Sequence, residues 1–167
     1  MVDLGLAFGQ QADSDSSDRS STIPGPGDVR RAAMNLLARR EHARKELVQK
    51  LSKKFSAIPE IVEEELDKLS AEGLQSDARL AEVFIRSRVS RGQGPVKIKM
   101  ELRGKGVDDD TLGRAFETCE VNWFALVEQV ARRRFGDSVP SDAKERARRG
   151  RFLQQRGFNF DHIGSLN

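Results

Sequence analysis

Apolar, basic and turn-forming residues recur in this chain with a period of 51 positions. In this register Leu51 falls on Leu102 and then on Leu153. The same register aligns two further sets of residues, Lys54 with Lys105 and Arg156, and Ile61 with Leu112 and Ile163. A recurrence of this length indicates tandem copies of one supersecondary unit, and a copy this small is near the lower limit for folding alone. The sequence therefore predicts a row of similar units that pack against one another.

Each unit is predicted to contain three short helices, because apolar stripes at helical spacing alternate with capping residues and turn signals. The predicted N-caps are Asp28, Ser76, Asp108 and Ser141, with Pro59 and Pro95 at first helical positions. The predicted helices cover about 28–40, 44–54 and 59–73, then 76–92, 95–104 and a segment from 108, then segments from 122, over 141–157 and after 159.

The predicted fold class is all-α, with three tandem three-helix repeats at 28–75, 76–120 and 121–167 that form an elongated, curved array. Residues 1–27 are acidic, rich in serine and poor in apolar side chains, so they are predicted to be a disordered tail. A thin array of this kind offers a long contact surface and no deep pocket.

Two segments complicate the pattern. Residues 96–102 alternate apolar and charged side chains, which is typical of a half-buried strand, yet they also contain two apolar pairs at i, i+4. We expect a helix, because the corresponding segment of the first unit does not alternate. Gly106 and Gly157 have Phe55 as their counterpart, so the first unit must make that turn differently.

The charged residues follow the same repeat. The formal net charge is +3, but residues 29–167 carry 28 basic and 21 acidic side chains. Basic blocks at 30–54, 86–105 and 132–156 are separated by acidic blocks at 59–82 and 108–120. Because serial units place equivalent side chains along one edge, the blocks predict a basic stripe that fits a polyanion or an extended acidic groove.

The candidate contact residues are the arginines and lysines of these blocks. They are Arg39, Arg40, Arg44, Lys45, Arg86, Arg88, Arg91, Lys97, Lys99, Arg132, Arg133, Arg148, Arg149 and Arg151, and Arg134 and Arg146 extend the same blocks. The alternative is that these side chains pair with acidic residues of the chain itself or simply face solvent. With no tyrosine and one tryptophan, any nucleic acid would be bound through phosphates, without strong sequence preference.

No catalytic, metal-binding or cofactor-binding constellation is predicted. Cys119 and Trp123 complete apolar stripes, and His42 and His162 are expected in turn or capping roles. The segment 92–95 superficially resembles a phosphate-binding loop but lacks its Gly-Lys-Ser/Thr ending, so we interpret it as a helix stop and start. Without a leader or membrane-spanning stretch, the expectation is a non-enzymatic, monomeric, cytoplasmic protein with no cofactor.

The motifs of the three units resemble those of the RecX family of bacterial recombination regulators. They are LLARREHARKEL at 36–47, FIRSRVSRGQGP at 84–95 with Ile98, Glu101 and Leu102, and FLQQRGF at 152–158 with Ile163. The resemblance covers about 30–167 and implies tandem three-helix repeats. The acidic tail and Phe55 depart from the family pattern.

The resemblance implies a regulator of the RecA recombinase in DNA recombination and repair. Such a protein would lie in the groove of the nucleoprotein filament or cap its growing end. It would reduce filament extension, ATP hydrolysis, strand exchange and the coprotease activity that triggers the SOS response. The motif positions Arg39, Arg40, Arg86, Arg88 and Arg91 are then candidates for contact or for holding the geometry between units. The competing class is a sequence-independent nucleic-acid-binding module with no dedicated protein partner.

Overall fold

The computed structural model describes residues 22–166, so most of the tail predicted over 1–27 lies outside the described residues. Within the described part all regular structure is helical. The helices are α1 (Pro26–Leu37), α2 (Arg44–Lys54), α3 (Pro59–Ala71), α4 (Asp77–Ser90), α5 (Pro95–Lys105), α6 (Asp109–Thr118), α7 (Trp123–Phe135), α8 (Ala143–Gln155) and α9 (Phe160–Gly164).

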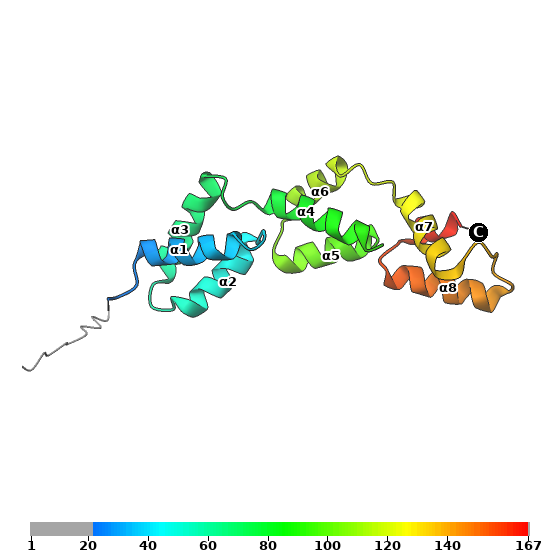
Figure 1. The fold of residues 1–167 in the computed structure, drawn as a ribbon, viewed down its shortest axis with the longest axis horizontal. Helices are drawn as coiled ribbons and strands as arrows, with labels where there is room; N and C mark the ends of the chain where they lie inside the picture. Colours follow the sequence, from blue (N-terminus) through cyan, green and yellow to red (C-terminus); the bar gives the residue numbers. More distant parts are fainter. Residues whose placement is uncertain (1–21, 167) are drawn as a thin grey trace, which may run out of the picture.

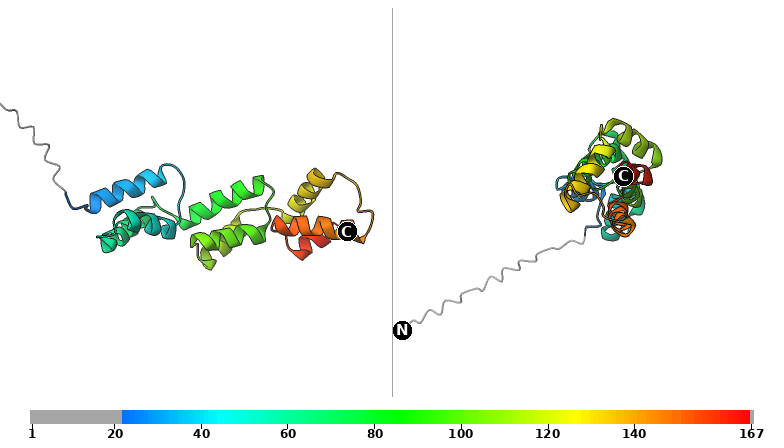
Figure 2. Two further views of the ribbon diagram at one scale, coloured as in Figure 1. Left: turned by 90° about the horizontal axis from the view of Figure 1, so that it is seen from below. Right: turned by 90° about the vertical axis from the view of Figure 1, so that its right-hand side faces the viewer.

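Three three-helix units follow one another in an elongated row (Figure 1). The first unit is α1–α3, the second is α4–α6 and the third is α7–α9, and the three helices of each unit contact one another. The middle helices α2, α5 and α8 lie one after another along one side of the row, and the view along its long axis shows a narrow cross-section (Figures 1 and 2). The prediction of an all-α array of three three-helix repeats is confirmed.

Each unit has its own small hydrophobic core, supplied by the apolar stripes of its helices. The buried side chains include Leu47, Leu51 and Leu66 in the first unit, Ile85, Ile98 and Leu102 in the second, and Val127, Leu153 and Phe158 in the third. Fully burying such a side chain contributes about 1.5–3 kcal/mol. A core of this size leaves each unit dependent on its neighbours, as the repeat length implied.

The segment with the alternating pattern is a helix, as expected. Ile98 and Leu102 are fully buried against the second core, whereas Val96 and Met100 are 53% and 63% exposed. The two i, i+4 pairs therefore lie on different faces of α5. The alternation reflects two apolar helical stripes, only one of which reaches a core.

The turn after each middle helix differs as the sequence suggested. Gly106 and Gly157 adopt left-handed backbone conformations, with φ of 94° and 95°. Phe55 has φ of −119° instead, its amide donates to the Leu51 carbonyl, and its side chain is buried in the first core. The first unit thus replaces a left-handed turn by a ring that fills its core.

Two predicted N-caps are wrong. Gly25 caps α1, which begins two residues earlier than expected, and Asp28 is the third helical residue, whose carboxylate accepts from the Gly25 amide. Asp142 caps α8, because its carboxylate accepts from the Glu145 amide, while Ser141 donates to the Glu145 carboxylate. At α1 the acidic side chain completes a capping box from within the helix, and at α8 the cap lies one residue later than spacing alone suggested.

The first helix also ends earlier than predicted, at Leu37 rather than near Arg40. The segment that connects α1 to α2 reaches the second unit, and the Ala43 side chain is fully buried in the core of that unit. Other predicted caps hold: Ser76 and Asp108 accept from the amides of Arg79 and Thr111.

Gly157 provides a test of how tightly the units are joined. A Cβ at Gly157 would lie 2.4 Å from the Lys97 Cβ and 2.7 Å from the Lys97 amide nitrogen, and the positive φ adds strain. We expect Gly157→Ala to lower the free energy of unfolding by about 1–3 kcal/mol in urea titrations. Gly104→Ala is the matched control, because Gly104 is helical with nothing within 4 Å, and it should be neutral or stabilising. Equal stability of the two variants would contradict the tight joint.

Candidate partner-binding surface

The position of any surface that crosses the units depends on the junctions between them. At the first junction the Glu46 carboxylate in α2 accepts from Lys105 Nζ in α5 at 2.8 Å. Its other oxygen accepts from the Ala43 amide at 3.1 Å. The Arg79 side chain in α4 donates to Glu41. Charged side chains therefore fasten the first unit to the second.

The second junction uses the backbone instead. The amides of Gly94 and Val96, at the start of α5, donate to the carbonyls of Arg156 and Gly157 at 2.7 and 3.0 Å. The Arg156 side chain donates to the Arg91 carbonyl at 3.1 Å. Carbonyls that follow α8 thus satisfy amides that the start of α5 leaves unpaired.

The 51-residue register explains why the junctions differ. Glu46 and Lys105 correspond to Lys97 and Arg156, which are both cationic and cannot pair. The backbone hydrogen bonds of the second junction take the place of that ion pair. They also occupy the Gly94 amide, while the amides of Gly92 and Gln93 donate to carbonyls at the end of α4. The segment 92–95 therefore ends one helix, starts the next and contacts the third unit, in agreement with its interpretation as a helix stop and start.

An aromatic contact completes the second junction. Trp123 stacks on Phe116 with ring centroids 5.8 Å apart and packs against the cores of both the second and the third unit. Cys119 packs on the second core. Both residues have the packing roles that the sequence predicted.

One histidine lies between two helices and the other lies at the start of α9. His42 is buried, with Nδ1 3.0 Å from the Arg40 carbonyl oxygen, and burial lowers its pKa. His162 caps the start of α9 by accepting from the Asn159 amide. His42 therefore lies in the segment between α1 and α2, and His162 caps the helix that contains it.

Six of the fourteen candidate cations are held in ion pairs. The pairs are Arg40 with Glu46, Arg44 with Glu63 and Asp67, Arg88 with Glu101, Arg132 with Glu128 and Asp137, and Arg148 and Arg149 with Glu145. Arg88 also lies over the Phe84 ring at 4.3 Å. Arg88 and Arg149 are half-buried, and their ion pairs hold the local geometry. For these two residues we therefore favour the alternative, in which the side chain pairs with an acidic residue of the chain itself.

The other eight candidates have no ion pair within the described part of the chain. They are Arg39, Lys45, Arg86, Arg91, Lys97, Lys99, Arg133 and Arg151. Lys99 lies over the Phe116 ring at 4.8 Å. The stem of Lys45 packs so closely on Gly106 that a Cβ there would lie 2.5 Å from it. Members of this set occur in all three units, and six of the eight are exposed.

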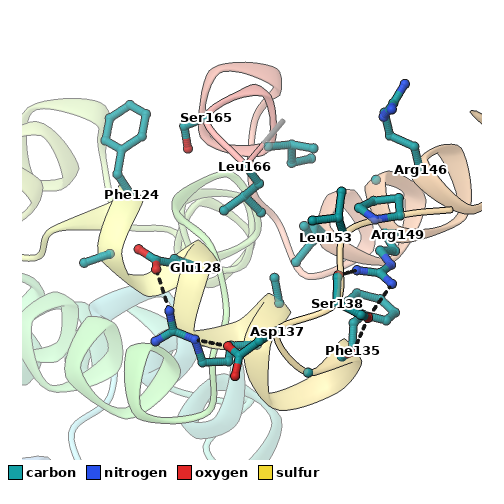
Figure 3. A pocket seen from close by; sticks show the side chains of 18 of the residues that line it. Phe124, Glu128, Phe135, Asp137, Ser138, Arg146, Arg149, Leu153, Ser165 and Leu166 are labelled. Atoms are coloured by element: carbon teal, nitrogen blue, oxygen red, sulfur yellow. Dashed lines mark hydrogen bonds and ion pairs between the residues drawn. The ribbon is translucent and has the colours of Figure 1, made fainter. Parts of the chain in front are cut away.

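The third unit carries a hollow that the sequence did not predict. It has a volume of about 730 Å³ and lies between α7, the loop after it, α8 and α9 (Figure 3). Arg132 pairs with Glu128 and Asp137 on one side, and Arg149 donates to the Ser138 carbonyl on the other. The sequence predicted a long surface with no deep pocket and did not indicate this open hollow, which the loop residues 136–140 line together with the helices.

No helix of the described residues is long and apolar enough to cross a membrane.

Three family models match the chain in order. Those described as the first, second and third three-helix domains of RecX match residues 30–69, 76–115 and 120–165. "Regulatory protein RecX" of Halorhodospira halophila is 50% identical over 135 residues, which are 81% of this chain and 83% of that protein. The chain belongs to the RecX family.

Other RecX proteins agree with this assignment. "Regulatory protein RecX" of Pseudomonas syringae pv. tomato is 46% identical over 84% of this chain and 90% of its own length. The crystal structure of RecX from Lactobacillus salivarius has a TM-score of 0.67 at 26% identity, and the alignment covers 84% of this chain and 93% of that one.

Sequence reasoning missed the residues that join the RecX units. Lys105 and Arg156 are basic positions that the repeat aligns, but the alignment did not indicate that both bridge two units. Gln75 donates to the His42 carbonyl across the first junction and was overlooked entirely. The sequence does contain one signal: Glu46 and Lys105, which have opposite charges, correspond to two cations one repeat later.

The first junction should depend on pH through Glu46. Burial alone would raise the pKa of this carboxyl, but hydrogen bonds from Lys105 and the Ala43 amide outweigh burial and lower it to about 2, from an ordinary 4.5. A lowered pKa stabilises the fold above pH 4.5, and the contribution is lost as the pH falls toward 2. We expect Glu46→Gln to cost about 2 kcal/mol of unfolding free energy at pH 7 and little at pH 2.5.

The matched control is Asp109→Asn, which breaks the exposed Arg103–Asp109 pair. It should change stability by less than about 0.5 kcal/mol in the same urea titrations. A Glu46→Gln cost that does not vary with pH would show that its charge does not fasten the junction.

Proposed function

We propose that this chain regulates the RecA recombinase by binding its nucleoprotein filament. The observation that carries the proposal is the set of cations that have no ion pair among residues 22–166, repeated over three units whose junctions fix their relative positions. Side chains that are not neutralised within the fold are available to an anionic partner. A filament is an extended partner, and a row of units can contact it over a greater length than a single pocket could.

Binding to the filament groove or to its growing end would limit filament extension. ATP hydrolysis, strand exchange and coprotease activity would fall as a consequence. The relatives named "Regulatory protein RecX" support a regulatory rather than a catalytic role. The proposal places this activity in the cytoplasm, with the chain acting as a monomer.

The direct test is the ATPase rate of RecA filaments on saturating single-stranded DNA, measured against increasing amounts of this protein. We expect inhibition at less than one molecule per recombinase if the chain caps growing ends, and inhibition near the filament's binding capacity if it fills the groove. Either result supports regulation. Inhibition that appears only when the DNA itself is sequestered would overturn the proposal in favour of a general nucleic-acid-binding module.

Single charge reversals locate the surface. Arg86→Glu and Arg91→Glu change exposed side chains without ion pairs in the described residues, so each should weaken inhibition about tenfold while helicity is unchanged. Arg88 is unsuitable, because reversing it would break its contacts with Glu101 and Phe84. The matched control is Lys53→Glu, because Lys53 is exposed but is not one of the candidate contact residues. Equal inhibition by all three variants would refute the assignment.

A further inference from the structure

A second hollow lies on the third unit, between the end of α7, the loop after it and α8. Its volume is about 530 Å³. It is lined by four arginines, two phenylalanines, one glutamate and two neutral polar residues, namely Arg134, Arg148, Arg149, Arg151, Phe135, Phe152, Glu145, Ser138 and Gln155. It shares Phe135, Ser138 and Arg149 with the larger hollow, so these three residues form the wall between the two.

The one carboxylate in the hollow is already neutralised. Glu145 accepts from the Ser141 amide at 2.9 Å and from Arg149 Nη2 at 2.6 Å, and these contacts lower its pKa to about 2. Arg149 is mostly buried and also donates to the Ser138 carbonyl at 2.6 Å. Glu145 and Arg149 therefore form the frame of the hollow and cancel each other's charge.

The lining of this hollow keeps a net charge of +3, because four arginines face one carboxylate. Neither Arg151 nor Arg134 has an ion pair among the described residues, and the Arg134 guanidinium lies 5.9 and 5.8 Å from the ring centroids of Phe135 and Phe152. Arg148 lies 3.7 Å from a Glu145 oxygen that is already bound to Arg149. Each guanidinium keeps several N–H donors free. Arg148 and Arg151 lie three residues apart on one face of α8, and Arg134 faces them from the last turn of α7.

The aromatic rings form the floor of the hollow and are not free to stack on bases. Phe135 and Phe152 meet edge to face with centroids 5.4 Å apart. Arg149 lies 4.9 Å from the centroid of Phe135, and Arg156 lies 5.4 Å from that of Phe152. Guanidinium groups thus cover the rings, and the donors that remain are suited to an oxyanion.

We propose that this hollow binds the phosphodiester groups of single-stranded nucleic acid. Three guanidinium groups from two helices can donate to a tetrahedral anion from several directions, whereas a planar carboxylate is best satisfied by a single fork. A flexible strand can turn a phosphate into a concave site, which a duplex, with phosphates fixed on a convex cylinder, does less easily. Binding at this site does not depend on recombinase regulation, because the ligand is free nucleic acid.

The test is binding of a fluorescent oligothymidylate of twelve nucleotides to the full chain, without recombinase, as a function of salt. The variant Arg134→Gln/Arg151→Gln removes two of the three charges and keeps helix-forming side chains. If each arginine contacts one phosphate, the slope of log affinity against log salt should fall by about 1.4, and affinity at 0.1 M salt should fall about 25-fold.

The matched control is Lys144→Gln/Arg146→Gln, which removes two charges from the same helix. Arg146 lines the larger hollow (Figure 3) and is not among the residues that line the arginine-lined one, and Lys144 lines neither. The control should keep the salt slope of the unmodified chain and lose less than about threefold in affinity. Circular dichroism verifies that both variants keep their helices.

Two results would overturn the proposal. One is equal affinity and equal salt slope for the two double variants, which would mean that the strand binds elsewhere or through net charge alone. The other is tighter binding of oligoglutamate or of a duplex of equal length, which would assign the hollow to an acidic protein or to double-stranded nucleic acid. Neither result bears on ATPase inhibition, so the regulatory proposal is tested separately.

Discussion

The rest of this structure depends on one kind of contact. In it, the middle helix of one unit packs against the turn that follows the middle helix of the next unit. At the first junction the Lys45 stem packs on Gly106, and at the second the Lys97 backbone packs on Gly157. A side chain on either glycine would overlap its neighbour. Because the approach is this close, each unit is held against the next, and the basic side chains of the array recur in fixed relative positions.

The two junctions reach this geometry by different means. Glu46 and Lys105 supply an ion pair at the first, whereas backbone hydrogen bonds and the stack of Trp123 on Phe116 hold the second. An ion pair depends on pH and salt, while backbone bonds and apolar packing depend on them far less. The first unit is therefore the one whose attachment responds to solution conditions or to an anion that competes for Lys105.

Much of the fold could be predicted from the sequence, because it rests on local periodicity. The helices, the left-handed turn at Gly106 and the packing role of Trp123 all follow from apolar spacing and turn chemistry. The candidate surface could be predicted only as a set of basic blocks. Whether an arginine is held in an internal ion pair depends on carboxylates from other helices, as with Arg44 and Asp67. Those pairings can be seen only in the tertiary structure. The hollows also depend on the path of a loop that has no periodicity.

We infer that the cations with no ion pair among residues 22–166 form one contact surface along a firmly joined array. Electron cryomicroscopy of this protein bound to RecA filaments tests it most directly. We expect an extended row whose three units all contact the filament, with Arg86 and Arg91 at the interface. A bound molecule that contacts the filament through one unit alone, or that turns these side chains toward solvent, would contradict it.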